Sequence, residues 1–213
     1  MSGFVFRIIS LLIRVAAVLL AISVHEAAHG YASYKLGDYT AKSMGRISVN
    51  PFRHLDPIGA LCMLVFGFGW AKPVMVNPYN FKNPTRDMAL VSAAGPISNF
   101  LMAFIAVALF KILTLIPMPD ILIVQIVFMF LSTFALLNIG LGVFNLLPIP
   151  PLDGSKIFLP LLPNKLYYDI MRYERYGWLI LVFALSLGVL DPILGTMQSA
   201  ILSLFKFIVG GGI

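Results

Sequence analysis

The chain has 213 residues, of which 60% are apolar and 11% are charged, with 15 Lys and Arg against 9 Asp and Glu. A water-soluble domain carries about a quarter charged residues. The mean hydropathy of +0.93 therefore excludes a soluble globule, a disordered tail and a nucleic-acid-binding domain. The single cysteine, Cys62, excludes an internal disulfide and a cysteine metal cluster. We expect one integral membrane domain, residues 1–213, in a lipid bilayer.

Runs with few or no charges are long enough to cross about 30 Å of hydrocarbon as helices in four places. They are residues 4–24, 88–110, 121–152 and 176–205. The first run has no small-residue cleavage site, so we expect a retained span. The last run carries only Asp191, and we expect one span or a span followed by a surface helix after a break at Asp191-Pro192. The sequence thus predicts an all-α polytopic membrane protein with about four to five transmembrane helices.

Residues 57–71 are uncharged but short, as is typical of a re-entrant or interfacial segment as much as of a span. Most Lys and Arg residues lie in residues 35–87 and 156–175. Positive charge gathers on the cytoplasmic side of a membrane protein. A re-entrant segment or a β-hairpin at 57–71 leaves both basic stretches on that side, whereas a crossing segment separates them. We favour re-entry, with the N-terminus outside, and keep an additional span as the alternative.

A motif with metal-binding spacing lies near the end of the first apolar run: His25-Glu26-Ala27-Ala28-His29. Histidines four residues apart share one helix face and can hold one metal ion. Glu26 follows the first ligand and can reach a water molecule on the metal as a general base. H-E-x-x-H also arises by chance in soluble helices. Ionisable residues within a membrane span, however, usually have a function.

The third ligand of a catalytic zinc has to come from elsewhere in the chain, because such a zinc usually has three protein ligands and one open position. Asp153 is the best candidate. It follows three prolines that end a helix, and irregular backbone at membrane depth usually lines a cavity. The alternative is that Asp153 caps the next helix. His54 is either a turn residue or a fourth ligand in a resting state.

Three motifs, in this order, resemble the site-2 protease family of intramembrane zinc metalloproteases. They are H-E-x-x-H, Gly95-Pro96-Ile97-Ser98-Asn99, and Asn145…Pro148…Pro151-Leu152-Asp153-Gly154. The resemblance covers a core of about residues 15–160, followed by C-terminal helices at 176–209. The chain looks like the compact branch of the family, without a PDZ or CBS domain.

The resemblance implies one zinc per chain and a set of site residues. His25, His29 and Asp153 would bind zinc, Glu26 would be the general base, and Asn145 would lie near the zinc as a donor to the oxyanion. The helix that carries Asn99 would pack beside the site. We expect Asn99 to form a helix–helix hydrogen bond rather than to act as a catalyst.

The implied reaction is hydrolysis of peptide bonds in transmembrane protein substrates, near the cytoplasmic side of the cell membrane. A zinc or cation transporter is the main alternative, because it also places His, Asp and Glu in the membrane. A transporter, however, does not need Glu26 beside its first ligand. A catalytically silent scaffold or chaperone is a third interpretation. The presence of a complete set of site residues argues against it, because a protein without activity does not need them.

Overall fold

The computed structural model describes residues 3–56, 59 and 72–210, and the described residues hold no β-strand, so the all-α prediction is confirmed. Apart from Gly59, the predicted re-entrant or β-hairpin segment at 57–71 lies outside the described residues. The helices are α1 (Gly3–Lys35), α2 (Thr40–Ser43), α4 (Pro84–Thr114), α5 (Leu122–Asn145), α6 (Asp153–Phe158), α7 (Asn164–Met171), α8 (Glu174–Ser186) and α9 (Asp191–Ile208). Short 3₁₀ turns lie at Pro51–Arg53, Pro78–Asn80 and Leu159–Leu161.

Helices α1, α4 and α5 are each long and apolar enough to cross a membrane. A fourth span is present if Arg175–Ser186 and Asp191–Ile208, which are bent by 82° at a short break, count as one. The break comes immediately before Asp191, close to the predicted position. Large apolar side chains of these helices are exposed, such as Leu11, Leu101 and Phe183. Exposed apolar surface of this kind suits lipid contact, and the protein is embedded in a membrane.

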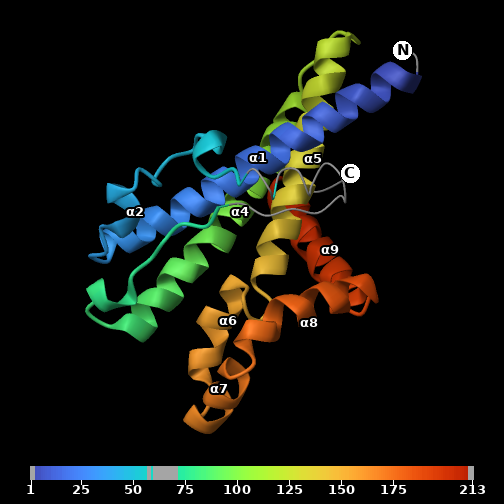
Figure 1. Ribbon diagram of the computed structural model, residues 1–213. Coiled ribbons are helices and arrows are strands. Elements are labelled where there is room, and N and C mark those ends of the chain that lie inside the picture. The colour runs from blue at the N-terminus through green and yellow to red at the C-terminus, as the bar shows by residue number, and fades with distance from the viewer. Residues whose placement is uncertain (1–2, 57–58, 60–71, 211–213) are drawn as a thin grey trace.

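Small side chains let α1, α4 and α5 pack closely. Ala17 and Ala21 of α1 meet Ala106 of α4 and Ala135 of α5 in one buried cluster. Membrane helices have no water to drive them together, so close backbone approach at small residues supplies much of their packing energy. Figure 1 shows α1 and α4 side by side, with α5 packed against both. This three-helix core carries most of the candidate site.

The N-terminus of α4 is capped by residues that the sequence places there. The Asn83 side chain accepts a hydrogen bond from the Arg86 N–H at 3.2 Å, and the Asp87 carboxylate accepts one from the Asn83 N–H at 3.1 Å. Pro84 occupies the first helical position, where a missing N–H does no harm. The first turn of α4 is therefore fixed, and the helix continues from there to the face that meets α1.

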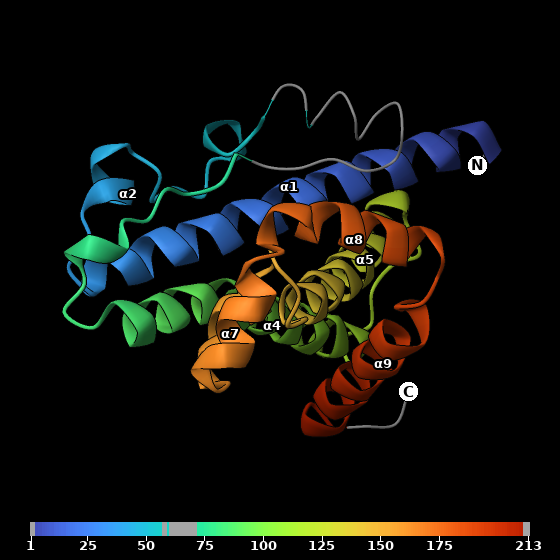
Figure 2. The same ribbon diagram turned by 60° about the horizontal axis from the view of Figure 1, so that its bottom comes forward.

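The chain leaves helical structure after α5 and resumes it at α6, because Pro148, Pro150 and Pro151 cannot continue a helix. Leu147 and Leu152 of this turn pack against α8 in a buried cluster. Helix α9 covers another face of the core, with Leu194 and Phe205 against α4 and α5. Figure 2 shows α8 lying across the end of α5, with α9 folded back beside it. The turn is thus held firmly, and it places Asp153, the first residue of α6, next to α1.

Candidate metal centre

Two histidines of α1 form the base of the site. His25 and His29 lie one helical turn apart and are 7% and 8% exposed. Their rings meet edge to face with centroids 4.6 Å apart, and their Nε2 atoms are 2.9 Å apart. Side chains four residues apart on a helix share a face. The H-E-x-x-H spacing therefore brings both Nε2 atoms to one point.

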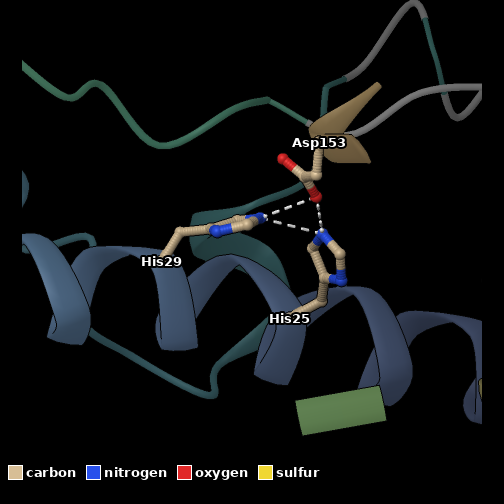
Figure 3. Close-up of side chains that lie close together, drawn as sticks. All are labelled: His25, His29 and Asp153. Carbon is tan, nitrogen blue, oxygen red and sulfur yellow. Dashed lines mark hydrogen bonds and ion pairs between the residues drawn. The ribbon is translucent and has the colours of Figure 1, made fainter. Parts of the chain in front are cut away.

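Asp153 completes a triangle with the two histidines. Its Oδ2 atom lies 3.2 Å from Nε2 of His25 and 3.2 Å from Nε2 of His29 (Figure 3). Asp153 is the first helical residue of α6; Leu152 occupies the N-cap position, so the side chain does not act as the cap. A Cβ atom on the next residue, Gly154, would collide with the carbonyl groups of Leu146 and Leu147. Glycine at 154 therefore lets the turn fold tightly enough to bring Asp153 to α1.

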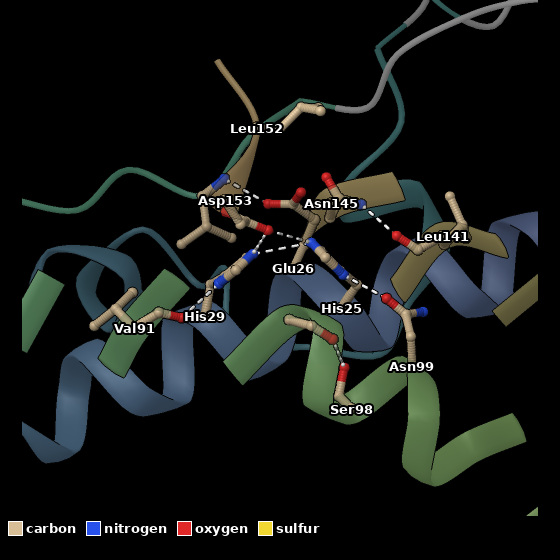
Figure 4. Close-up of polar contacts among 12 residues, drawn as sticks. His25, Glu26, His29, Val91, Ser98, Asn99, Leu141, Asn145, Leu152 and Asp153 are labelled. Carbon is tan, nitrogen blue, oxygen red and sulfur yellow. Dashed lines mark hydrogen bonds and ion pairs between the residues drawn. The ribbon is translucent and has the colours of Figure 1, made fainter. Parts of the chain in front are cut away.

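Helix α4 orients both imidazole rings from the other side. Nδ1 of His25 lies 2.6 Å from Oδ1 of Asn99, and Nδ1 of His29 lies 2.7 Å from the Val91 carbonyl oxygen (Figure 4). Both partners are oxygen acceptors, so in each neutral ring Nδ1 carries the proton and donates. Nε2 then keeps its lone pair for a metal, an arrangement common to metal-binding histidines.

The donor set fits a zinc ion. Two Nε2 lone pairs and a carboxylate oxygen converge at 2.9, 3.2 and 3.2 Å, and three acceptors repel at such distances unless a cation lies between them. Ligands about 2.1 Å from a tetrahedral zinc stand roughly 3.4 Å from one another. Among the described residues, His25, His29 and Asp153 form the one group of three His, Cys, Asp or Glu side chains whose ligand atoms are close enough together to hold an ion. The arrangement leaves a fourth position for water or substrate.

The surroundings of Asp153 favour the carboxylate form, which is the form that a metal ion would need. Burial by itself would raise the pKa of its carboxyl group. When no metal is bound, protonated forms of His25 and His29 donate hydrogen bonds and carry positive charge, which together outweigh burial and hold the pKa of this carboxyl group well below its ordinary value. The carboxylate form of Asp153 is therefore available to bind a cation across the physiological pH range.

Glu26 points into the same pocket without joining the triangle. Its Oε2 atom accepts a hydrogen bond of 2.8 Å from the backbone N–H of Val74, and among the described residues no donor reaches Oε1. Val74 belongs to a stretch without regular secondary structure that runs from 72 to 77 along α1. One carboxylate oxygen of Glu26 is thus fixed by backbone. The other can serve a water molecule.

Asp38 anchors the stretch that carries Val74. It is fully buried, and its carboxylate accepts hydrogen bonds from the Asn77 N–H at 2.9 Å, from the Asn80 side chain at 2.7 Å, and from the Thr40 hydroxyl and N–H. Burial alone would raise the pKa of Asp38, but these hydrogen bonds stabilise the carboxylate and lower it. Asp38 therefore ties the segment above the site to the end of α1.

A pocket of about 210 Å³ opens over the triangle. Its lining includes Glu26, Val74, Met88, Asn145 and Lys156. Asn145 ends α5, and its Nδ2 group donates to the Leu141 carbonyl at 3.0 Å (Figure 4). An amide nitrogen carries two hydrogens, so a second N–H of Asn145 is left for a group bound in the pocket.

The other two residues singled out from the sequence have different positions. Asn99 is fully buried and contacts the ring of His25, as described above. His54 is 2% exposed but does not join the triangle. Its Nε2 atom lies 2.7 Å from the Ser48 carbonyl oxygen, so that nitrogen is used in holding its own loop.

Three contributors to the site were not foreseen from the sequence: Val74, Val91 and Asn138. The first two act through backbone groups, which no side-chain pattern reveals. Asn138 hydrogen-bonds Asn99 from α5. It did carry a signal, because it is an uncharged but strongly polar residue within an apolar span, where polar side chains usually bond to neighbouring helices.

Comparison with known proteins places these residues among metalloproteases. Residues 110–187 match peptidase family M50, a stretch that includes the 145–153 motif and leaves out 25–29. The chain is 40% identical over 214 residues, 98% of both chains, to "Putative zinc metalloprotease YwhC" of Bacillus subtilis (strain 168). It is 30% identical over 179 residues, 82% of both chains, to "Putative zinc metalloprotease MJ0611" of Methanocaldococcus jannaschii.

A third relative is more distant. The chain is 27% identical over 177 residues to "Putative zinc metalloprotease Rip2" of Mycolicibacterium smegmatis, covering 80% of this chain and 65% of the relative. No solved structure matches the chain. Relatives from bacteria and an archaeon are thus named for one reaction class.

Proposed function

Because the chain belongs to peptidase family M50, the site-2 protease family of zinc metalloproteases, we propose that it is an intramembrane endopeptidase that hydrolyses peptide bonds of transmembrane proteins. One observation carries this proposal. Two imidazole nitrogens and a carboxylate oxygen converge on one point of a pocket at the side of α1, with Glu26 beside them. His25, His29 and Asp153 hold one zinc ion per chain.

The reaction divides between the metal and the side chains of the pocket. When bound, zinc supplies Lewis acidity, which lowers the pKa of a water molecule and polarises a carbonyl group. Glu26 accepts a proton from the attacking water at Oε1 and delivers it to the leaving nitrogen. The Val74 N–H holds Oε2 and so keeps Oε1 turned toward the pocket. The free N–H of Asn145 donates to the oxygen of the scissile carbonyl as negative charge develops there.

The substrate is the transmembrane segment of another protein, and it has to unwind before cleavage. A helical peptide bond is shielded by side chains and already hydrogen-bonded, so it cannot reach Glu26. The pocket lies against α1 and α4, two helices apolar enough to span the membrane. This location supports a substrate that arrives through the bilayer rather than from water.

The enzyme lies in the cell membrane with its site toward the cytoplasm. The support is the charge distribution: most Lys and Arg residues lie in the stretches 35–87 and 156–175, and Val74 of the first stretch and Lys156 of the second line the pocket. Positively charged loops remain on the cytoplasmic side.

Glu26→Gln is the decisive variant. Purified protein in detergent should keep one zinc per chain, measured by elemental analysis, and lose about 10²–10⁴ of its rate on a model transmembrane substrate. Glu174→Gln, the same change at the other glutamate of the chain, is the matched control and should cleave normally, because Glu174 is far from the H-E-x-x-H motif in the sequence and belongs to none of the three motifs.

The outcomes separate the proposal from its rival. If the protein is a transporter, the wild type should cleave no substrate, and zinc flux into liposomes that contain the wild type should be measurable. Asp153→Ala provides the complementary test, since it should lose zinc as well as activity. Full zinc retention in Asp153→Ala would place the third ligand elsewhere.

A further inference from the structure

A chain of hydrogen bonds links His25 to the middle of α5. Nδ1 of His25 lies 2.6 Å from Oδ1 of Asn99, and Nδ2 of Asn99 donates to Oδ1 of Asn138 at 2.8 Å. Nδ2 of Asn138 donates to the carbonyl oxygen of Phe134 at 2.8 Å. Both asparagines are fully buried. The relay thus joins α1, α4 and α5, and its two asparagines are shielded from solvent.

The direction of this relay is set at its far end. A backbone carbonyl such as that of Phe134 can only accept, so the group of Asn138 that faces it must be the NH₂ group. Turning the Asn138 amide over would bring two acceptor oxygens together inside the protein, which is costly. The oxygen of Asn138 therefore faces Asn99.

The same argument passes along the relay to the metal site. Because Asn99 faces the Oδ1 atom of Asn138, it must present its NH₂ group to Asn138 and its own oxygen to His25. His25 in turn must carry its proton on Nδ1. The lone pair of Nε2 is then left at the point where Asp153 and His29 converge.

We infer that Asn138 is a positioning residue that fixes the tautomer of His25 through Asn99, and so prepares Nε2 to bind the metal. The inference rests on the zinc site of the proposed function. His29 needs no such relay, because its Nδ1 contacts the Val91 carbonyl directly. The two histidines thus differ in one respect, and His29 serves as an internal control within the same protein.

Three substitutions of Asn138 distinguish positioning from packing. Asn138→Ser leaves a hydroxyl that can bond the carbonyl one turn back on its own helix but is too short to reach Asn99. Asn138→Leu removes all hydrogen bonding at similar volume. Asn138→Asp keeps the relay: a buried carboxyl group is neutral, and it accepts from Asn99 while donating to Phe134. Val143→Ala, at another fully buried position of α5, controls for lost packing.

The experiment uses the full chain in detergent with ¹⁵N-labelled histidine, after removal of metal by a chelator. Long-range ¹H–¹⁵N spectra at a pH where imidazoles are neutral report the tautomer of each ring. We expect His25 to be protonated on Nδ1 in the wild type, Asn138→Asp and Val143→Ala. In Asn138→Ser and Asn138→Leu, His25 should lose this preference while His29 keeps it.

Zinc affinity, measured by competition with a chromogenic chelator, gives the second readout. It should fall about 10–100-fold in Asn138→Ser and Asn138→Leu, the usual effect of losing a group that supports a metal ligand, and stay near wild type in Asn138→Asp. If Asn138→Ser leaves both the His25 tautomer and zinc affinity unchanged, the inference is wrong. If Asn138→Leu does not fold, Asn138→Ser and Asn138→Asp still decide. If the wild type binds no zinc, the proposed function fails, and the tautomer spectra still test the relay.

Discussion

Gly95 sets how closely α4 approaches the rings of His25 and His29, and replacing it with alanine should disturb both rings directly. A Cβ atom at position 95 would lie 2.5 Å from Cε1 of His25 and 2.5 Å from Cε1 and Nε2 of His29. Ordinary van der Waals contacts begin near 3.4 Å. Either the rings or α4 must therefore move by about 1 Å, and a displacement of that size in an active site can cost roughly 10²-fold in rate.

The chain offers a matched control for Gly95→Ala. Gly140 is also inside a long helix, but a Cβ there would meet only the Gln198 side chain at 3.6 Å, an ordinary contact. Both substitutions gain the same helix propensity, about 1 kcal/mol. Any difference between them therefore reports the contact with His25 and His29.

The assay combines three measurements on each variant: zinc content, cleavage of a model transmembrane substrate, and thermal unfolding in detergent. Gly95→Ala should bind zinc at least 10-fold more weakly and cleave about 10²-fold more slowly. Overpacking should also lower its stability by about 1–3 kcal/mol. Gly140→Ala should match the wild type in zinc and cleavage. If Gly95→Ala keeps wild-type zinc affinity and rate, close approach of α4 does not position the rings.

Three further changes test other parts of the structure. Asn145→Ala should keep its zinc and lose about 10²–10³ in rate, the usual effect of losing one oxyanion donor; a wild-type rate would make Asn145 a packing residue. Asp38 has a lowered pKa, so its carboxylate stabilises the fold above pH ~4 and this contribution fades as pH falls. Asp38→Asn should thus lower Tm at pH 7, with a gap to wild type that narrows below pH ~4; a constant gap would contradict this account. Cysteines replacing Lys72 or Lys82, in a Cys62→Ala background, should resist an impermeant reagent applied outside intact cells, and labelling of both would show that 57–71 crosses the membrane.

Much of the fold could be predicted from charge and length alone. The apolar run at 4–24, which carries only Arg7 and Arg14, and the uncharged run at 88–110 lie inside α1 and α4, because a membrane span tolerates few charges over a fixed length. The run at 121–152 was too long, since it continues through prolines that end α5 at Asn145. Hydropathy does not distinguish an apolar helix from an apolar turn, whereas the prolines at 148, 150 and 151 indicate that the helix has ended.

The site was only partly readable from the sequence, and the reason is physical. His25 and His29 lie on the same helix, so their spacing alone places them on one face. Asp153 could be identified as a candidate, but its approach to α1 depends on the turn at 146–152 and on Gly154. Contacts such as Asn99 to Asn138 depend on the packing of α4 against α5, which periodicity within either helix does not specify.

The contact between Val74 and Glu26 affects how this chain can tolerate random mutation. Its donor is a backbone N–H, and every amino acid except proline supplies one. Position 74 can therefore drift in sequence while Glu26 stays oriented, and the Val91 carbonyl gives His29 the same protection. His25 lacks this protection, because the side chains of Asn99 and Asn138 orient it and most substitutions would remove them. In a library of random variants, we therefore expect inactivating substitutions outside His25, His29 and Asp153 to occur more often at positions 99 and 138 than at positions 74 and 91.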